Sequence, residues 1–167
     1  MSVATIGPDN TPSVRIVLLK HVDDRGFVFY TNMMSRKSED LKVNPFAALC
    51  FYWQPMGKQV RIEGKAAPTS EIEANEYFAS RPRGSQISAW ASKQSQTLES
   101  RQLFDEQLTK FTNTYEGATI PRPKYWSGWR IYPSSIEFWM QGDDRAHDRW
   151  LFRRSTEISW SRTLLYP

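Results

Sequence analysis

The chain has 167 residues, enough for one well-buried core but too few for two independent domains of ordinary size, so we expect a single domain over residues 1–167. Hydrophobic residues make up 40% of the chain and charged residues 24%, which argues against a disordered protein. The net charge of +4 permits an anionic partner, but it does not distinguish nucleic acid, an anionic membrane surface and a small anionic ligand.

Aromatic side chains and the single cysteine narrow the possibilities. The seven Trp, seven Tyr and nine Phe are more large rings than a core of this size readily hides, so we expect some to line a ligand site or a subunit interface. Cys50 cannot form an intrachain disulfide and is expected to be a small buried hydrophobe in a reducing, cytoplasmic setting. The first ten residues lack the pattern of a secretion signal, and no run of about 18 apolar residues indicates a membrane span.

The first half of the chain is predicted to form β-strands with one helix inserted. Val, Ile, Phe and Tyr are concentrated in four segments, and the sequence Asp-Asp-Arg-Gly connects the first two as a hairpin. These strands are expected over 13–20, 26–31, 46–53 and 58–68. Between the second and third strands a helix is expected over 35–44, because Ser35 is a suitable N-cap and Pro45 prevents the helix from continuing.

The middle of the chain is predicted to be helical, and the remainder returns to strands. Ser70 is expected to cap the first helix, and Pro82 ends it. Helices are expected over 70–81, 85–92 and 99–115, followed by a loop over 116–126. Strands are expected over 128–133, 136–141, 148–154 and 158–164, the last within the C-terminal segment 158–167. The order of strands, helices and strands predicts an α+β fold whose antiparallel sheet curls into a barrel.

Two basic residues open the helix predicted at 35–44. Arg36 and Lys37 lie where the helix dipole is already positive, an unfavourable arrangement unless an anion docks there. Free backbone amides and both side chains would then converge on a phosphate. Two solvated basic residues on a surface turn are an equally good interpretation of the same pattern.

Tyr77, Arg81 and Ser85 form a second candidate anion site. Tyr77 and Arg81 are four residues apart and share a helix face, while Ser85 follows Pro82 and is expected to cap the next helix. A phenol, a guanidinium and a hydroxyl beside free amides would suit a second phosphate. The alternative is that Arg81 and Arg83 are exposed to solvent in a simple connector.

The segment 143–150, Asp-Asp-Arg-Ala-His-Asp-Arg-Trp, contains one of the two histidines. If it forms a strand, Arg145, His147 and Arg149 share one face, and that face is cationic. A metal at His147 would need the nearby aspartates while two guanidiniums repelled the cation, so we expect no metal here. The aspartates are expected to form turns or to pair with the arginines. His21 is expected to be incidental.

No motif for nucleotide phosphates, zinc or a nucleophilic serine occurs in the sequence. Two candidate phosphate sites, many rings and one cationic segment suit a phosphorylated aromatic cofactor together with a second anionic substrate. A nucleic-acid binder is disfavoured because the basic residues form no long run.

Several segments, taken in order, resemble the pyridoxine/pyridoxamine 5′-phosphate oxidases, a family of FMN-binding split barrels. The resemblance runs from about Val14 to Arg154 without large insertions, and the number of ordered matches makes it specific. The matching segments are RIVLLK (15–20), FVFYTN (27–32), SRK (35–37), NPFAALCFYW (44–53), QVRIEG (59–64), YFASRPRGSQISAWAS (77–92), QSQ (94–96), IEFW (136–139) and the basic residues at 145, 147 and 149.

The resemblance implies a split β-barrel that forms a homodimer with FMN at the subunit interface. It implies that FMN is held by Arg15, Ile16, Val17, Leu18, Leu19, Lys20, Tyr30, Thr31, Arg36, Lys37, Gln59, Gln94, Ser95, Trp139 and Arg149. The substrate phosphate would lie among Lys20, Tyr77, Arg81 and Ser85. Arg145 and His147 would close over the pyridine ring and are the candidate catalytic residues.

By the same resemblance, the chain is expected to oxidise pyridoxamine or pyridoxine 5′-phosphate to pyridoxal 5′-phosphate. A hydride equivalent would leave C4′ for FMN, dioxygen would form hydrogen peroxide, and the amine would release ammonia. The alternative is a non-catalytic carrier or sensor of flavin or pyridoxal phosphate on the same fold.

The chain departs from the family pattern at both ends. The segment before the first strand is shorter than usual, which is expected to loosen the lid over the substrate. The C-terminal segment WSRTLLYP (160–167) keeps Trp160, Arg162 and Pro167 but changes the spacing between the last two, so the C-terminal contacts are expected to differ.

Overall fold

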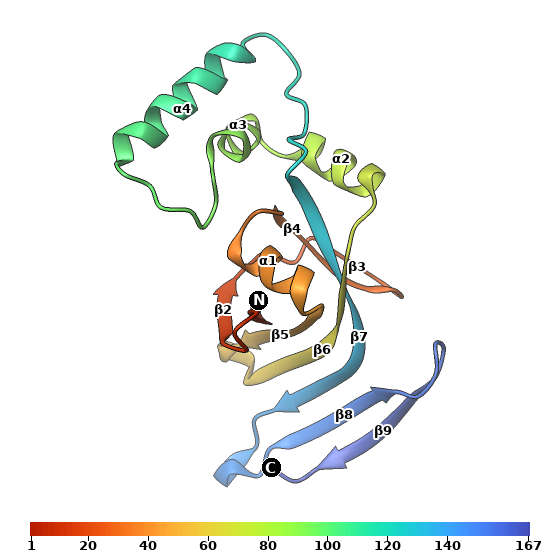
Figure 1. Ribbon diagram of the computed structural model, residues 1–167. Coiled ribbons are helices and arrows are strands. Elements are labelled where there is room, and N and C mark those ends of the chain that lie inside the picture. The colour runs from red at the N-terminus through yellow and green to blue at the C-terminus, as the bar shows by residue number, and fades with distance from the viewer. The chain divides into compact units, whose positions relative to one another are not determined.

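The computed structural model describes residues 1–167, and the chain forms two compact units (Figure 1). The sheet unit consists of Met1–Phe29, Asp40–Ala67 and Arg130–Pro167. The helical unit consists of Tyr30–Glu39 and Pro68–Trp129. Buried apolar side chains occur in both units.

The chain contains nine strands, four α-helices and two short 3₁₀ turns. The strands are β1 (Ser2–Ile6), β2 (Pro12–Ile16), β3 (His21–Asp23), β4 (Gly26–Asn32), β5 (Phe46–Trp53), β6 (Lys58–Pro68), β7 (Trp126–Met140), β8 (Asp148–Arg154) and β9 (Trp160–Leu165). The helices are α1 (Arg36–Val43), α2 (Glu71–Ser80), α3 (Arg83–Ala91) and α4 (Arg101–Thr114). The 3₁₀ turns are η1 (Gln54–Met56) and η2 (Asp143–Arg145).

The strands form one open sheet with the order β2-β1-β5-β6-β7-β4-β3, to which β8 is added on β7 and β9 on β8. The neighbours β1 and β2, β1 and β5, β5 and β6, β7 and β8, and β8 and β9 all pair antiparallel. In Figure 1, β8 and β9 are the blue hairpin at the C-terminal end of the chain. The predicted α+β fold with an antiparallel split barrel is therefore confirmed.

Alternation along the strands builds the core of the sheet unit. In β1, Val3 and Thr5 are buried while Ala4 between them is more exposed, as the two-residue period of a strand requires. Leu49 and Ile62, paired across β5 and β6, are buried on the same side. Burial of such side chains removes apolar surface from water and is the main favourable contribution to folding.

Two of the expected strand boundaries are wrong. No strand was expected before residue 13, yet the small residues of β1 pair with both β2 and β5. Val3, Thr5 and Ile6 are β-branched and favour a strand, and pairing on both sides stabilises this short segment. The strand expected over 13–20 also stops earlier, since β2 ends at Ile16.

β7 is one long strand where two strands, 128–133 and 136–141, were expected. Pro133 interrupts the sequence pattern but lies inside the strand and is buried. Gly26 and Gly64 lie beside this part of β7. A Cβ added at Gly26 would lie 2.0 Å from the Ile131 carbonyl oxygen, and one added at Gly64 would lie 2.1 Å from the Tyr132 carbonyl oxygen. The neighbouring strands can approach this closely because glycine has no side chain.

The helices of the helical unit agree closely with the sequence prediction. Ser70 forms the expected cap of α2 as a capping box: its hydroxyl accepts from the Glu73 amide at 3.2 Å, and its own amide donates to Glu73 Oε2 at 3.0 Å. Ser100 caps α4 through a single hydrogen bond, in which its hydroxyl accepts from the Leu103 amide at 3.3 Å. None of the helices has both the length and the apolar character needed to cross a bilayer.

An aromatic cluster forms the core of the helical unit. Its buried members are Phe78, Ile87, Ala89, Ile120 and Trp126. Partly buried rings pack against them, namely Tyr30, Tyr77, Trp90, Phe111 and Tyr115. Many of the abundant rings noted in the sequence are thus structural, but this cluster also borders the second candidate anion site.

Candidate functional site

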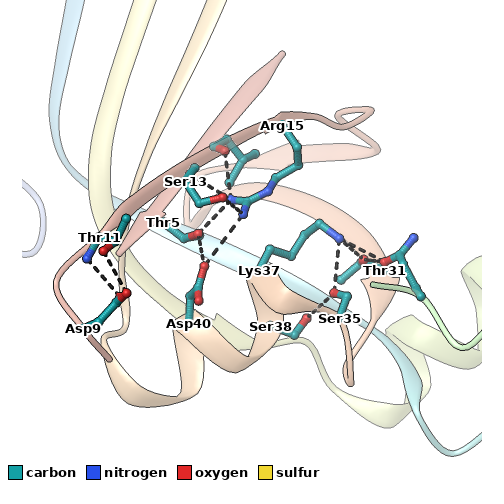
Figure 2. Close-up of polar contacts among 12 residues, drawn as sticks. Thr5, Asp9, Thr11, Ser13, Arg15, Thr31, Ser35, Lys37, Ser38 and Asp40 are labelled. Carbon is teal, nitrogen blue, oxygen red and sulfur yellow. Dashed lines mark hydrogen bonds and ion pairs between the residues drawn. The ribbon is translucent and has the colours of Figure 1, made fainter. Parts of the chain in front are cut away.

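Lys37 is the centre of the first anion site in the helical unit. Its side chain is buried, with 8% of the residue exposed. The ammonium Nζ donates to Thr31 Oγ1 at 3.1 Å, to Ser35 Oγ at 3.1 Å and to Gln94 Oε1 at 3.0 Å (Figure 2). The end of β4, the start of α1 and the segment after α3 therefore meet at one positive charge. Thr31, Lys37 and Gln94 were all expected to bind FMN, and the structure brings them together.

Two further residues of the expected FMN set are sequence neighbours of residues in this site: Arg36, expected at the FMN phosphate, precedes Lys37, and Ser95 follows Gln94. Arg36 is exposed and makes no hydrogen bond or ion pair within the chain. Ser95 is exposed in a turn and has a positive φ of 71°, a conformation in which few residues other than glycine, Asn and Asp are found. Ser35 precedes α1 as expected, but its hydroxyl donates to the Asn32 carbonyl at 2.7 Å and does not cap a helix amide.

Arg81 is the centre of the second anion site, also in the helical unit. Its Nη1 atom is buried and has no hydrogen-bond partner. Burial lowers the pKa of Arg81, and the nearby Tyr77 acts in the opposite direction, but an arginine stays protonated in proteins. A buried, charged N–H group without an acceptor is unfavourable, so this atom is suited to donate to an anionic ligand.

Aromatic rings surround the Arg81 guanidinium. Its central carbon lies 4.6 Å from the centroid of the Trp126 ring. Tyr77 lies nearly parallel to Trp126, with centroids 6.1 Å apart, so the phenol and the guanidinium, expected to share a helix face, both pack against this ring. The interpretation of Arg81 as a solvent-exposed connector residue is wrong, because half-buried Arg81 packs on these rings.

Ser85 differs from its expected role, whereas Arg83 is exposed to solvent, as the alternative interpretation held. α3 begins at Arg83 after Pro82, so Ser85 lies inside the first turn, where its amide donates to the Pro82 carbonyl at 2.8 Å. It is therefore not the cap of α3. Arg83 donates to the carbonyls of Tyr115 and Ala118 and so ties the start of α3 to the residues after α4.

The segment 143–150 of the sheet unit is a turn followed by a strand, so the predicted cationic strand face is wrong. η2 covers Asp143–Arg145, and β8 begins only at Asp148. Asp144 and Arg145 have positive φ values of 50° and 66°. The alternation that placed Arg145, His147 and Arg149 together requires a continuous extended strand, but Arg145 has a positive φ and the strand begins only after His147.

His147 packs against Trp139 at the start of β8. The ring centroids lie 4.6 Å apart, and the Gly142 amide donates to His147 Nδ1 at 3.2 Å. An accepting Nδ1 places the imidazole proton on Nε2. Arg145 is exposed beside this pair, so both candidate catalytic side chains lie in one loop, with Nε2–H as a possible donor to a ligand.

Arg149 pairs with a glutamate, although one of the neighbouring aspartates was considered as its partner. Arg149 Nε donates to Glu137 Oε1 at 2.9 Å, and Nη1 donates to the Tyr166 carbonyl at 3.0 Å. Glu137 is buried and also accepts from Arg61 Nη1 at 3.3 Å. Asp143 acts as a turn former, because its carbonyl accepts from the Ala146 amide at 2.8 Å. Glu137 was missed in the sequence because its pairing depends on the β7–β8 register.

Arg15, expected to bind FMN, has its guanidinium bound to its own sheet (Figure 2). Nη1 donates to Thr5 Oγ1 at 2.7 Å, and Nη2 donates to Ser13 Oγ at 2.9 Å. Thr5 in turn donates to the buried Asp40 carboxylate at 2.6 Å. This network links β1, β2 and α1, and no sequence pattern indicated it.

The remaining residues of the expected FMN set lie along β2 and β6 and after them. Within 15–20, side chains alternate between half-buried and exposed, with Ile16 74% and Leu18 66% exposed. Lys20 is exposed, and its amide donates to the Val28 carbonyl at 2.9 Å. Gln59 on β6 is half-buried, and its Oε1 lies 3.6 Å from Cys50 Sγ.

The outer face of β2, β1 and β5 is apolar and exposed. Val14 is 67% exposed and Phe46 59%, and a shallow hollow of about 150 Å³ between the strands is lined by Ser2, Ala4, Val14, Ala48, Leu49, Cys50, Arg61, Ile62 and Glu63. Cys50 borders this hollow and is only half-buried, so the expectation of a fully buried thiol is wrong. Contiguous apolar surface of this kind typically marks a contact with another protein.

Family profiles match nearly the whole chain. A profile described as "Pyridoxamine 5′-phosphate oxidase" matches residues 1–115, and one described as "Pyridoxine 5′-phosphate oxidase C-terminal dimerisation region" matches residues 126–167. Among solved structures, PhzG from Burkholderia lata 383, described in complex with tetrahydrophenazine-1-carboxylic acid, superposes with a TM-score of 0.93 at 31% identity, covering 99% of this chain and 81% of that one. A pyridoxamine 5′-phosphate oxidase-related, FMN binding protein from Nostoc punctiforme PCC 73102 shares the fold, with a TM-score of 0.80 at 16% identity, covering 99% of this chain and 87% of that one.

Curated relatives are similar over the full length of the chain. The pyridoxine/pyridoxamine 5′-phosphate oxidase of Myxococcus xanthus (strain DK1622) is 49% identical, and the alignment covers 100% of this chain and 81% of the relative. The protein of the same name from Brucella ovis is 51% identical, again covering 100% of this chain and 81% of the relative. On these matches and the shared fold, the chain belongs to the pyridoxine/pyridoxamine 5′-phosphate oxidase family.

Proposed function

We propose that this chain is an FMN-dependent oxidase that converts pyridoxamine or pyridoxine 5′-phosphate to pyridoxal 5′-phosphate, with dioxygen as the acceptor and hydrogen peroxide as the product. The observation that carries the proposal is the buried Nη1 of Arg81, which has no hydrogen-bond partner and is suited to a phosphate oxygen. Relatives about 50% identical over the whole chain carry the name of this oxidase.

The Lys37 site fits the phosphate of FMN. A buried ammonium beside a hydroxyl and a carboxamide offers charge and hydrogen-bonding groups at one point. Exposed Arg36 and the turn at Ser95 are the proposed further contacts. Residues 15–20, Tyr30, Gln59, Trp139 and Arg149 complete the proposed cofactor site, on the resemblance to the family.

The Arg81 site fits the phosphate of the substrate, with Tyr77, Ser85 and Lys20 as the proposed further ligands. Fixing this phosphate orients the pyridine ring and its C4′ substituent, which lowers the entropic part of the barrier. Bound FMN supplies the acceptor for the hydride equivalent, and dioxygen takes up two electrons and two protons to form hydrogen peroxide. When the substrate is the amine, water enters and ammonia leaves.

Arg145 and His147 are the proposed residues next to the reacting carbon. The Nε2–H of His147 can donate to an oxygen substituent on the pyridine ring, and Arg145 adds a positive charge beside it. The Trp139 ring limits the motion of the imidazole. These residues therefore bind and orient the ring, and the two-electron chemistry belongs to the flavin.

The functional form is a homodimer built from one FMN-binding domain over residues 1–167, in a reducing, cytoplasmic setting. The match of residues 126–167 to a dimerisation region supports the dimer. So does the exposed apolar face of β2, β1 and β5, which a second copy would remove from water.

The direct test is to purify the protein, record a flavin spectrum, and add pyridoxamine 5′-phosphate in air. The expected result is bound FMN together with equal amounts of aldehyde and peroxide. Bound FMN without turnover would exclude the oxidase and favour the carrier or sensor. Arg145→Met and His147→Gln should lower kcat/KM of an oxidase but leave flavin binding by a flavin carrier nearly unchanged.

A further inference from the structure

The Arg81 guanidinium is held by aromatic rings and forms no ion pair. Its central carbon lies 4.6 Å from the ring centroid of Trp126 and 5.6 Å from that of Phe78. The face of an aromatic ring attracts the guanidinium cation but does not accept hydrogen bonds from its in-plane N–H groups, as a carboxylate would. The charge and the donors of Arg81 therefore stay available for an anion.

Trp126 is fixed in place before any ligand binds. It is 6% exposed, and its amide donates to the Pro123 carbonyl at 2.9 Å. Its ring is nearly parallel to that of Tyr30, with centroids 5.5 Å apart, and meets Phe78 edge to face at 5.1 Å. Neighbours on several sides leave the indole little freedom, so Arg81 rests on a rigid surface.

Arg81 has little other support in the chain. It lies one residue beyond α2 with an extended backbone, φ −74° and ψ 148°, and its amide donates to the Phe78 carbonyl at 3.2 Å. No side chain accepts a hydrogen bond from its buried Nη1. A long arginine side chain without a fixed support would occupy several rotamers, and ligand binding would have to order it.

We propose that Trp126 is a positioning residue for the substrate phosphate, an inference that rests on the proposed oxidase function. Its ring holds the Arg81 guanidinium so that Nη1 is oriented toward the phosphate before the ligand arrives. Trp126 does not bind the phosphate itself. It raises the affinity for phosphorylated ligands because the ordering of Arg81 takes place during folding and not during binding.

The first experiment measures binding of pyridoxal 5′-phosphate to the FMN-loaded protein, with inorganic phosphate as competitor. Trp126→Leu should lower the affinity for both ligands about tenfold, because a desolvated cation–π contact is lost. Trp126→Phe should lower it about threefold. Trp90→Leu is the matched control. It removes an indole that packs on the same cluster but has no contact with Arg81, so phosphate affinity should stay within about twofold.

Kinetics separate positioning from general damage. In Trp126→Leu, KM for pyridoxamine 5′-phosphate should rise about tenfold with kcat nearly unchanged, and kcat/KM for unphosphorylated pyridoxamine should stay the same. An equal loss of kcat/KM for both substrates would overturn the role. So would unchanged phosphate affinity in the folded variant, or failure of the wild type to bind phosphate.

A double-mutant cycle covers the case in which Trp126→Leu does not fold. Trp126→Phe should weaken phosphate binding in the Arg81 protein but not in the Arg81→Met protein, since the ring acts through the guanidinium. Equal losses in both backgrounds would contradict the inference.

These binding measurements do not require catalytic turnover. A wild type without oxidase activity would therefore count against the proposed function alone, whereas normal turnover with unchanged phosphate affinity would count against the role of Trp126 alone.

Discussion

Lys37 carries a positive charge into a buried position beside neutral oxygen atoms. An ammonium ion loses hydration there, and three hydrogen bonds to Thr31, Ser35 and Gln94 replace part of it. In our proposal the same charge attracts the phosphate of a flavin nucleotide, so the structural and the binding role would coincide in one side chain.

Replacing Lys37 by Met should weaken FMN binding about tenfold to a hundredfold, because a hydrogen bond to a charged group contributes about 1.5–3 kcal/mol. Titration of flavin fluorescence would measure it, and riboflavin, which has no phosphate, should bind almost as before. Lys42→Met is the control, since Lys42 is an exposed lysine in the last turn of the same helix. Equal weakening of FMN and riboflavin would contradict the assignment.

Asp23 shows how a single carboxylate makes stability depend on pH. Burial acts to raise its pKa, but the hydrogen bond from Arg25 and the charges of Arg130 and Arg25 outweigh burial, and the pKa is lowered. Arg130, which is 2% exposed, donates to Asp23 Oδ1 at 2.5 Å. A lowered folded-state pKa means that the stabilisation is complete above the unfolded value of about 3.9 and is lost as the pH falls through the folded value.

Asp23→Asn should therefore lower the free energy of unfolding by about 1–3 kcal/mol at pH 7, because buried Arg130 loses a charged acceptor. The difference from the wild type should shrink as the pH falls below about 4. Urea denaturation at pH 7 and at two acidic pH values would measure it. Asp24→Asn, at the exposed neighbouring position, should have little effect at any pH. A difference that is constant with pH would refute the linkage.

At the scale of elements, β7 depends on glycines in its neighbours. Gly64→Ala would place a Cβ 2.1 Å from the Tyr132 carbonyl oxygen, and the strands would have to separate. We expect a loss of about 3 kcal/mol. Gly84→Ala is the opposite case. It lies in α3 with no atom within 4 Å of the added Cβ, and should stabilise the protein by up to about 1 kcal/mol through helix propensity.

Thermal unfolding would compare the two variants, since 1 kcal/mol corresponds to roughly 2–4 °C in Tm for a protein of this size. Gly64→Ala should lower Tm and Gly84→Ala should raise it. A Gly64→Ala protein with the Tm of the wild type would mean that β6 and β7 adjust without cost, contrary to the close approach seen here.

At the scale of the whole molecule, the outer face of β2, β1 and β5 determines the oligomeric state in our proposal. Val14→Glu places a charge on that face without replacing any residue of the proposed cofactor set, and should shift the protein from dimer to monomer in sedimentation. FMN affinity should fall with dissociation, because the proposed flavin site needs both subunits. Ile72→Glu, at a position 69% exposed on α2, should leave the dimer intact. A dimeric Val14→Glu protein would show that another surface forms the interface.

Local signals in the sequence predicted the helices well. Ser70 and Pro82 delimit α2 within one residue of the expected bounds, because caps and proline act through their immediate neighbours. The basic start of α1 likewise predicted an anion site, and the structure places Lys37 beside Thr31 and Gln94, two other residues of the expected set. Such features are encoded within a few residues, and a single sequence is enough to read them.

Other features were decided by the tertiary structure alone. Gln94 accepts a hydrogen bond from Lys37, which lies 57 residues earlier in the sequence. Trp126, the first residue of β7, packs against Arg81 at the end of α2. β7 continues through Pro133 because glycines in the adjacent strands make room for it. The segment with Arg145 and His147 forms a turn, although a strand was considered there. Sequence periodicity describes which side of an element faces a core. It does not specify which distant side chain lies opposite, since close packing of the whole chain selects that partner.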